Sequence, residues 1–143
     1  MKTLTYYIFS LFLISCTEMK DFSSIKEDES ITVCLLSAEV YNEASQDAAK
    51  EYLERREVVN KLTLEGEQRA TFFNEFLDES NYEPLNRKCK FEPVYALVVN
   101  NKLFALLDVE YCPTLQYVNG KNSKYVGIAA ENSLKKLLED NLK

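Results

Sequence analysis

Apolar residues along this chain gather in short runs that are typical of buried β-strands. The run Ile31 to Leu36 is rich in β-branched residues and almost wholly apolar, which predicts a strand buried on both faces. Residues 58–64 form a second candidate strand, although Asn60 interrupts their alternation. Two longer runs, residues 94–99 and 103–109, complete the pattern and predict two further strands.

The last two runs are close enough to form a β-hairpin. They are separated by Asn100, Asn101 and Lys102. Asparagine tolerates positive φ angles, so Asn100 and Asn101 can form a two-residue type I′ turn. In that register Val99 faces Lys102.

The same register, carried outward along both strands, brings Cys89 opposite Cys112. Opposed residues of an antiparallel pair have Cα atoms about 4.5 to 5.5 Å apart, which is within disulfide range. We therefore predict a Cys89–Cys112 disulfide in an oxidising compartment, with Cys34 as a buried free thiol. The pairings that involve Cys34 stay open as alternatives.

Helical spacing of apolar residues predicts three helices, at Asn42–Arg55, Glu67–Asp78 and Ala129–Asn141. The second carries a stripe of aromatic residues that is typical of a core face. Together with the strands, these segments predict an α+β fold: a small, mainly antiparallel sheet of about four strands with about three helices packed on one face.

The N-terminal residues have the layout of an export signal. Lys2 supplies one positive charge, and the stretch from Leu4 to Ile14 is almost entirely apolar. At about 1.5 Å per residue in a helix, this stretch covers only about half of a hydrocarbon core of ~30 Å, so it is too short for a lasting membrane span. It ends on Leu13-Ile14-Ser15-Cys16.

That ending resembles the lipobox of bacterial lipoproteins, which consists of an aliphatic, a permissive and a small residue followed by cysteine. The resemblance implies that a peptidase removes residues 1–15 and that Cys16 becomes the lipidated first residue of the mature protein. Two acyl chains give stable attachment, at about 0.8 kcal/mol for each buried methylene. The alternative is an uncleaved anchor or a buried strand in which Cys16 has no special role.

The segment after the cysteine is polar and acidic. Residues 16–29 are therefore expected to be a lipidated cysteine and flexible tether, and residues 30–143 a single α+β domain. Position 17 is Thr17 rather than aspartate, which by analogy with enterobacterial sorting disfavours retention in the inner membrane. We expect a lipid-anchored protein of the bacterial cell envelope, with the outer membrane preferred and either its periplasmic or its surface face.

The composition argues against nucleic acid as a partner and against catalysis or zinc binding by histidine. The 143 residues are 46% apolar and carry a net charge of −6. Removal of residues 1–15, which hold one lysine and no acid, makes the charge −7. An acidic domain repels phosphate backbones, which argues against nucleic acid. The chain has no histidine, the commonest general base and zinc ligand, and no cofactor is expected.

The C-terminal half carries a second resemblance. The segment Cys89-Lys-Phe-Glu-Pro-Val-Tyr-Ala, the apolar hairpin and the ending Val-Glu-Tyr-Cys112 are together similar to small uncharacterised lipoproteins, chiefly of Bacteroidota. Those proteins often have histidine where Tyr95 stands and a further cysteine after the second one, and this sequence has neither. The resemblance covers residues 60–143 and implies no function.

Three functional hypotheses follow. The first is a membrane-anchored envelope lipoprotein with a small non-catalytic domain that binds another protein or a surface component, with a protein partner expected. The second is a thiol redox protein that uses Cys89 and Cys112, although neither lies in a Cys-x-x-Cys motif. The third is a carboxylate-based enzyme or metal site at Asp108 and Glu110, which share a face if both lie on one strand. Their alternative role is to mark the solvent face of an edge strand. We favour the first hypothesis.

Overall fold

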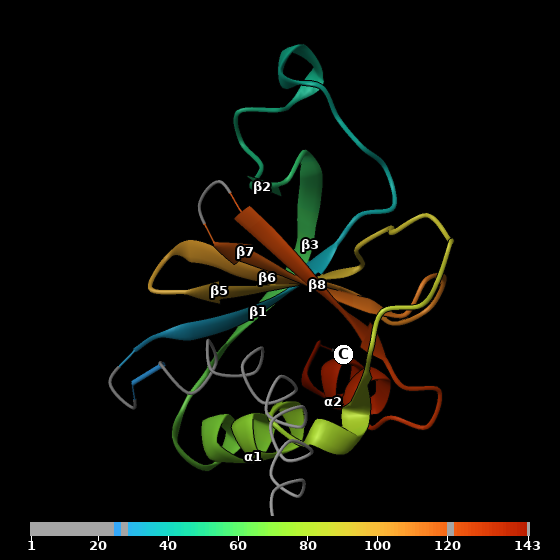
Figure 1. Cartoon of the computed structure of the whole chain (residues 1–143). Coiled ribbons are helices and arrows are strands. Elements are labelled where there is room, and N and C mark those ends of the chain that lie inside the picture. The colour runs from blue at the N-terminus through green and yellow to red at the C-terminus, as the bar shows by residue number, and fades with distance from the viewer. Residues whose placement is uncertain (1–24, 27–28, 120–121, 143) are drawn as a thin grey trace, which may run out of the picture.

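The protein is built on one antiparallel sheet that carries two α-helices on the same side (Figure 1). The computed structural model describes residues 25–26, 29–119 and 122–142. Within them, eight strands lie in the order β2-β3-β1-β5-β6-β7-β8-β4. The strands are β1 (Ile31–Leu36), β2 (Tyr52–Leu53), β3 (Arg56–Leu64), β4 (Tyr82–Glu83), β5 (Tyr95–Val99), β6 (Lys102–Asp108), β7 (Thr114–Asn119) and β8 (Asn122–Ile128). The helices are α1 (Gly66–Phe76) and α2 (Leu134–Leu142), with short 3-10 helices η2 (Glu43–Ser45) and η3 (Glu79–Asn81).

The prediction of about four strands and three helices is wrong, because four further strands extend the sheet. The predicted strands correspond to β1, β3, β5 and β6. The added strands are β2 and β4 at the two edges and the hairpin of β7 and β8. The edge strands have two residues each, which is too short for an alternating pattern to be recognised. The fold is consequently richer in β-structure than the sequence pattern indicated.

The helix predicted at Asn42–Arg55 is also wrong. The segment contains only η2, a bent connection and β2, and it ends in a tight turn. The ring centroids of Tyr41 and Tyr52 lie 5.4 Å apart, edge to face, so the aromatic residues of this segment pack on each other. Only Tyr52 and Leu53 of this segment form a sheet contact, as β2, while Ala44, Ala48 and Ala49 are exposed. Over so few turns, helical spacing of apolar residues does not distinguish these cases from a helix.

The other two helices are confirmed, with changed boundaries. The helix predicted at Glu67–Asp78 is α1, and its Phe72 and Phe76 are buried as expected. The helix predicted at Ala129–Asn141 is α2, which begins only at Leu134. The side-chain oxygen of Asn132 accepts hydrogen bonds from the first backbone N–H groups of this helix, at 3.0 Å from Leu134 N, and so caps its start.

The main core lies between the helices and one face of the sheet. Alternate residues of β1, β5, β6, β7 and β8 point into it, together with the buried faces of α1 and α2. The amide of Asn60 on β3 donates to the backbone carbonyl of Leu142 at 2.7 Å, which ties the end of α2 to the sheet. Asn60, which broke the strand pattern in the sequence, therefore has a structural role.

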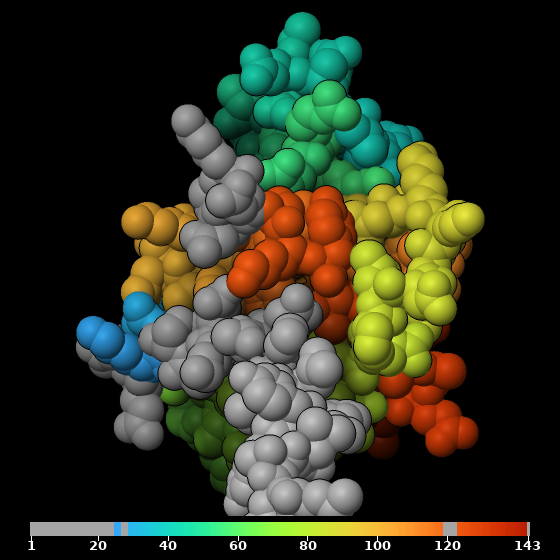
Figure 2. Space-filling view, in the orientation of Figure 1, coloured from blue at the N-terminus to red at the C-terminus, as the bar shows by residue number. Residues whose placement is uncertain are grey.

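The opposite face of the sheet holds a smaller apolar cluster of Cys34, Leu36, Ala96 and Leu106. Phe91 packs against this cluster and meets the ring of Tyr125 on β8, with centroids 6.0 Å apart. Phe91 belongs to residues 84–94, which link the edge strand β4 to the central strand β5 and are called the crossover segment below. Figure 2 shows this segment, in yellow, on the surface beside β8.

The hairpin of β5 and β6 has the predicted turn. Asn100 and Asn101 have φ angles of 48° and 61°, and Val99 pairs with Lys102. A bulge follows at once, so that Leu97 pairs with Ala105. The predicted register therefore holds only near the turn, and Cys89 lies outside the ladder because β5 begins at Tyr95.

Candidate interaction site at the disulfide-linked turn

The turn between β6 and β7, residues 109–113, is organised by the buried carboxylate of Asp108. This side chain is 0% exposed. Its Oδ1 accepts backbone hydrogen bonds from Glu110 (3.0 Å) and Tyr111 (2.9 Å), and its Oδ2 accepts from Cys112 (3.0 Å) and Glu92 (3.0 Å). Four N–H donors together compensate for the burial of the charge. We call residues 109–113 the Tyr111 turn.

Local sequence explains part of this arrangement. An aspartate at the end of a strand can accept from the N–H groups two and three residues further on, which reverses the chain direction. Asp108 does this for Glu110 and Tyr111. The fourth donor, Glu92, comes from the crossover segment. One carboxylate thus joins two segments that are distant in sequence.

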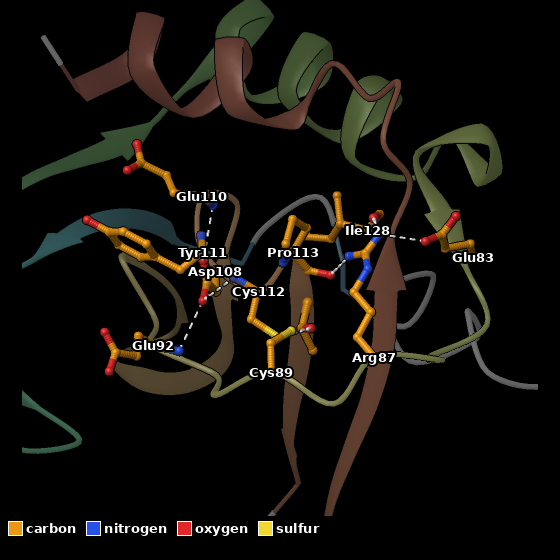
Figure 3. Close-up of a disulfide and its surroundings, with 11 residues drawn as sticks. Glu83, Arg87, Cys89, Glu92, Asp108, Glu110, Tyr111, Cys112, Pro113 and Ile128 are labelled. Carbon is orange, nitrogen blue, oxygen red and sulfur yellow. Dashed lines mark hydrogen bonds and ion pairs between the residues drawn. A yellow bond between two sulfur atoms is a disulfide. The ribbon is translucent and has the colours of Figure 1, made fainter.

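The disulfide predicted between Cys89 and Cys112 is present in the structure (Figure 3). The S–S distance is 2.06 Å and the Cα atoms are 5.6 Å apart. The pair forms even though Cys89 lies outside the sheet ladder, because the crossover segment passes beside the Tyr111 turn. The bond holds the crossover segment to this turn at a second point, next to the contact with Asp108.

Arg87 provides a third attachment of the crossover segment. Its guanidinium donates to the backbone carbonyls of Pro113 and, at 2.8 Å, of Ile128, and it pairs with Glu83 on β4. Figure 3 shows the side chain reaching across the end of β8 to these groups. The planar guanidinium group of arginine has five N–H donors, so it can form hydrogen bonds with several backbone carbonyls that do not pair with a neighbouring strand.

Tyr111 is the most exposed of the large apolar and aromatic residues in the described structure, at 70%. Its backbone is fixed by Asp108, while its ring points away from the domain (Figure 3). Two partly exposed acids lie on the same side of the domain: Glu110, 3.4 Å from Lys135 Nζ, and Glu92, 2.6 Å from Lys90 Nζ. The result is an aromatic side chain presented on a rigid turn with charged groups beside it.

The two carboxylates proposed for catalysis or metal binding do not form a joint site. The expectation that they share a strand face is wrong, because β6 ends at Asp108 and Glu110 lies in the turn. Asp108 is buried and bound by N–H groups, whereas Glu110 is exposed and pairs with Lys135. Among the described residues, no group of three or more histidine, cysteine, aspartate or glutamate side chains is placed to hold a metal ion.

The predictions for the two cysteines outside the disulfide, Cys34 and Cys16, are taken in turn. Cys34 is a free thiol and is 1% exposed, as predicted. Burial, and to a smaller extent the charge of Glu51, raise the pKa of this thiol from 9.0 to about 11 against the opposing effect of Lys61. Cys16, the predicted lipid attachment site, lies outside the residues that the structure describes.

The sequence did not indicate that Tyr111 is exposed. Its sequence neighbours Glu110 and Cys112 were noticed for their own chemistry, but a single tyrosine after an apolar run gives no sign of exposure. The usable signal was the change from the apolar run of 103–109 to the charged Glu110, which indicates a turn. Exposure on that turn depends on Asp108 and the disulfide, and only the fold brings these together.

Within the described part of the chain, no helix is long and apolar enough to cross a membrane. Comparisons with protein-family models, with curated proteins and with solved structures find no match to this chain.

Proposed function

We propose that this chain is an exported lipoprotein, anchored through Cys16, whose folded domain binds a protein of the cell envelope through the Tyr111 turn. The lipobox-like residues Leu13 to Cys16 support the anchor. The Cys89–Cys112 disulfide supports export, because such bonds persist in oxidising compartments. The proposed role of the domain is non-catalytic.

The observation that carries the binding role is the exposure of Tyr111 on a turn that is held rigid. An exposed flexible aromatic residue loses conformational freedom on binding, which weakens the complex. Here the backbone at Tyr111 is already fixed by the carboxylate of Asp108 and by the adjacent disulfide. Tyrosine is among the residues enriched at the energetic centres of protein interfaces, because it buries a large ring and keeps a hydroxyl for hydrogen bonding.

Charge indicates the kind of protein that would bind. The chain has a net charge of −6. Near the turn Glu110 pairs with Lys135 and Glu92 with Lys90, so the excess negative charge belongs to the chain as a whole. A partner with a pocket for the phenol ring and a basic rim would be attracted over a distance and oriented on approach. We therefore expect an envelope protein with such a surface, and a salt-dependent association rate.

The proposal is tested by replacing Tyr111 with the photoreactive p-benzoylphenylalanine and irradiating intact cells. Val59, which is 59% exposed, and Tyr125, which is 45% exposed, provide matched control positions. We expect one protein to be crosslinked from position 111 and not from the controls. The purified partner should then bind the Tyr111→Ala variant at least about 30-fold more weakly and the Tyr125→Ala variant unchanged. Equal crosslinking at all three positions, or equal affinity of the two variants, would refute a role for the turn.

A further inference from the structure

The disulfide has an exposed half and a buried half. Cys89 is exposed, whereas Cys112 is 3% exposed. Cys89 also lies in a basic stretch of an otherwise acidic chain, between Lys88 and Lys90 and two residues after Arg87. Lys88 is exposed, and the side chain of Lys90 is 84% exposed. Arg87 pairs with Glu83 and Lys90 with Glu92, so among the described residues Lys88 is the cation next to Cys89 that has no acidic partner.

This asymmetry matters because thiol–disulfide exchange begins with a thiolate anion. The thiolate attacks one sulfur in line with the S–S bond, and the other sulfur leaves. Only the Cys89 side is open to an attacking group, and Lys88 beside it attracts an anion. The departing sulfur of Cys112 lies 3.8 Å from Oγ1 of Thr114, whose hydroxyl can donate to the new thiolate.

We propose that Cys89 is a thiol-exchange site at which a dithiol reductant opens the disulfide of the folded protein. One thiolate of the reductant bonds to Cys89 Sγ, the Cys89–Cys112 bond breaks, and Cys112 leaves as a thiolate that takes up a proton. The second thiol of the reductant, as its thiolate, then attacks its own bonded sulfur. This step releases Cys89 as a thiol and leaves the reductant as a disulfide. The inference is independent of the binding role of Tyr111.

The crossover segment has contacts that survive this reaction. Arg87 stays bonded to the carbonyls of Pro113 and Ile128 on one side of Cys89, and the N–H of Glu92 stays bonded to Asp108 on the other. Opening the bond therefore frees only residues 88–90, because Phe91 also stays packed against the apolar cluster and Tyr125. Exchange is expected to proceed without unfolding of the domain.

The first test treats the native domain with an excess of reduced glutathione, quenches it with acid and locates the adduct by mass spectrometry. Glutathione serves as the probe because it has no second thiol with which to release itself, so the mixed disulfide lives long enough to be trapped by acid. We expect the adduct on Cys89, with Cys112 as a free thiol and the buried Cys34 unlabelled by an alkylating reagent. An adduct on Cys112 would overturn the proposal. So would exchange that exposes Cys34 at the same rate, because it would require unfolding.

The second test measures the contribution of charge. The variant K88E/K90E should react with glutathione about fivefold more slowly, because the attacking thiolate is repelled, and with the thiol cysteamine, whose ammonium group offsets its charge, less than twofold more slowly. The variant K102E/K124E makes the same change in net charge at exposed positions in the β5–β6 hairpin and on β8, and should react as the wild type. Equal rates for all three proteins with glutathione would show that the basic stretch has no role.

Discussion

At the scale of single residues, three polar side chains of the described structure hold segments together through backbone groups. Asp108 binds four N–H groups, Arg87 binds two carbonyls, and Asn81, which is 3% exposed, donates to the carbonyl of Glu75 and accepts from the N–H of Ser133. Each joins segments that no strand pairing connects. Replacing such a group lowers the free energy of unfolding strongly, because its buried hydrogen-bond partner is then bonded neither to protein nor to water.

We predict that Asp108→Asn destabilises the domain by about 2–4 kcal/mol, because an amide turns one acceptor into a donor facing N–H groups. Denaturant unfolding measures this as a lower midpoint at an unchanged slope. Asp78→Asn is the matched control, because Asp78 is exposed and its side chain accepts from Ser80 N at 2.9 Å. This substitution should lower the free energy of unfolding by less than about 1 kcal/mol. Similar losses at both positions would contradict the role given to Asp108.

The raised pKa of Cys34 predicts a loss of stability at alkaline pH. The folded domain favours the neutral thiol, whose pKa is about 11, whereas an exposed thiol ionises near 9.0. The contribution of the buried Cys34 thiol to the free energy of unfolding is therefore complete below pH 9 and is lost as the pH rises from about 9 to 11. The difference in unfolding free energy between wild type and Cys34→Ala should shrink over that window, while the tyrosines titrate equally in both proteins. A pH-independent difference would contradict this.

At the scale of elements, the sheet is lengthened by two-residue edge strands that depend on close contacts. Gly127 on β8 faces Glu83 on β4, and a Cβ atom at position 127 would lie 2.9 Å from the carbonyl oxygen of Glu83 and 3.2 Å from that of Pro84. Backbone atoms cannot move aside as the tip of a side chain can. The absence of a side chain at this position is therefore what lets β4 approach.

We predict that Gly127→Ala detaches β4 and destabilises the domain by about 1–3 kcal/mol. Hydrogen exchange should report the loss at the amide of Glu83, which pairs with Gly127, with little change in β1. Normal protection of this amide in the variant would mean that β4 can shift without leaving the sheet.

The turn between β2 and β3 offers a stabilising change. Glu54 and Arg55 have φ angles of 46° and 65°, in the left-handed region that asparagine and glycine adopt more readily. The double change Glu54→Asn and Arg55→Gly should raise stability by about 1 kcal/mol. Thermal unfolding measures the gain, and Glu131→Asn, at an exposed position outside this turn, should give none. A decrease in the double variant would show that these side chains stabilise the turn in another way.

At the scale of the whole molecule, the proposed lipid anchor determines where the domain acts. Cys16→Ala should abolish incorporation of labelled fatty acid and release the protein from the membrane fraction, since a single peptide without acyl chains has no stable attachment. Cys34→Ala, which changes another cysteine outside the disulfide, should label and fractionate as the wild type does. Continued labelling of the Cys16 variant would refute the lipobox assignment.

The sequence by itself determined the features that depend on local patterns. These are the four apolar runs of the domain that form β1, β3, β5 and β6, the Asn100-Asn101 turn, the helices α1 and α2, the Cys89–Cys112 pair and the free Cys34. Period, turn propensity and cysteine spacing are properties of neighbouring residues, so they can be recognised without the fold.

The tertiary structure alone decided the edge strands, the fold of residues 42–55 and the character of the site. Two-residue strands exist only because a neighbouring strand supplies their hydrogen bonds. Asp108 changed from a candidate catalytic group to the centre of a turn because donors as distant as Glu92 reach it. Burial and hydrogen-bond partners are set by contacts between distant segments, and these contacts also turned Tyr111 outward and left Cys89 open to solvent.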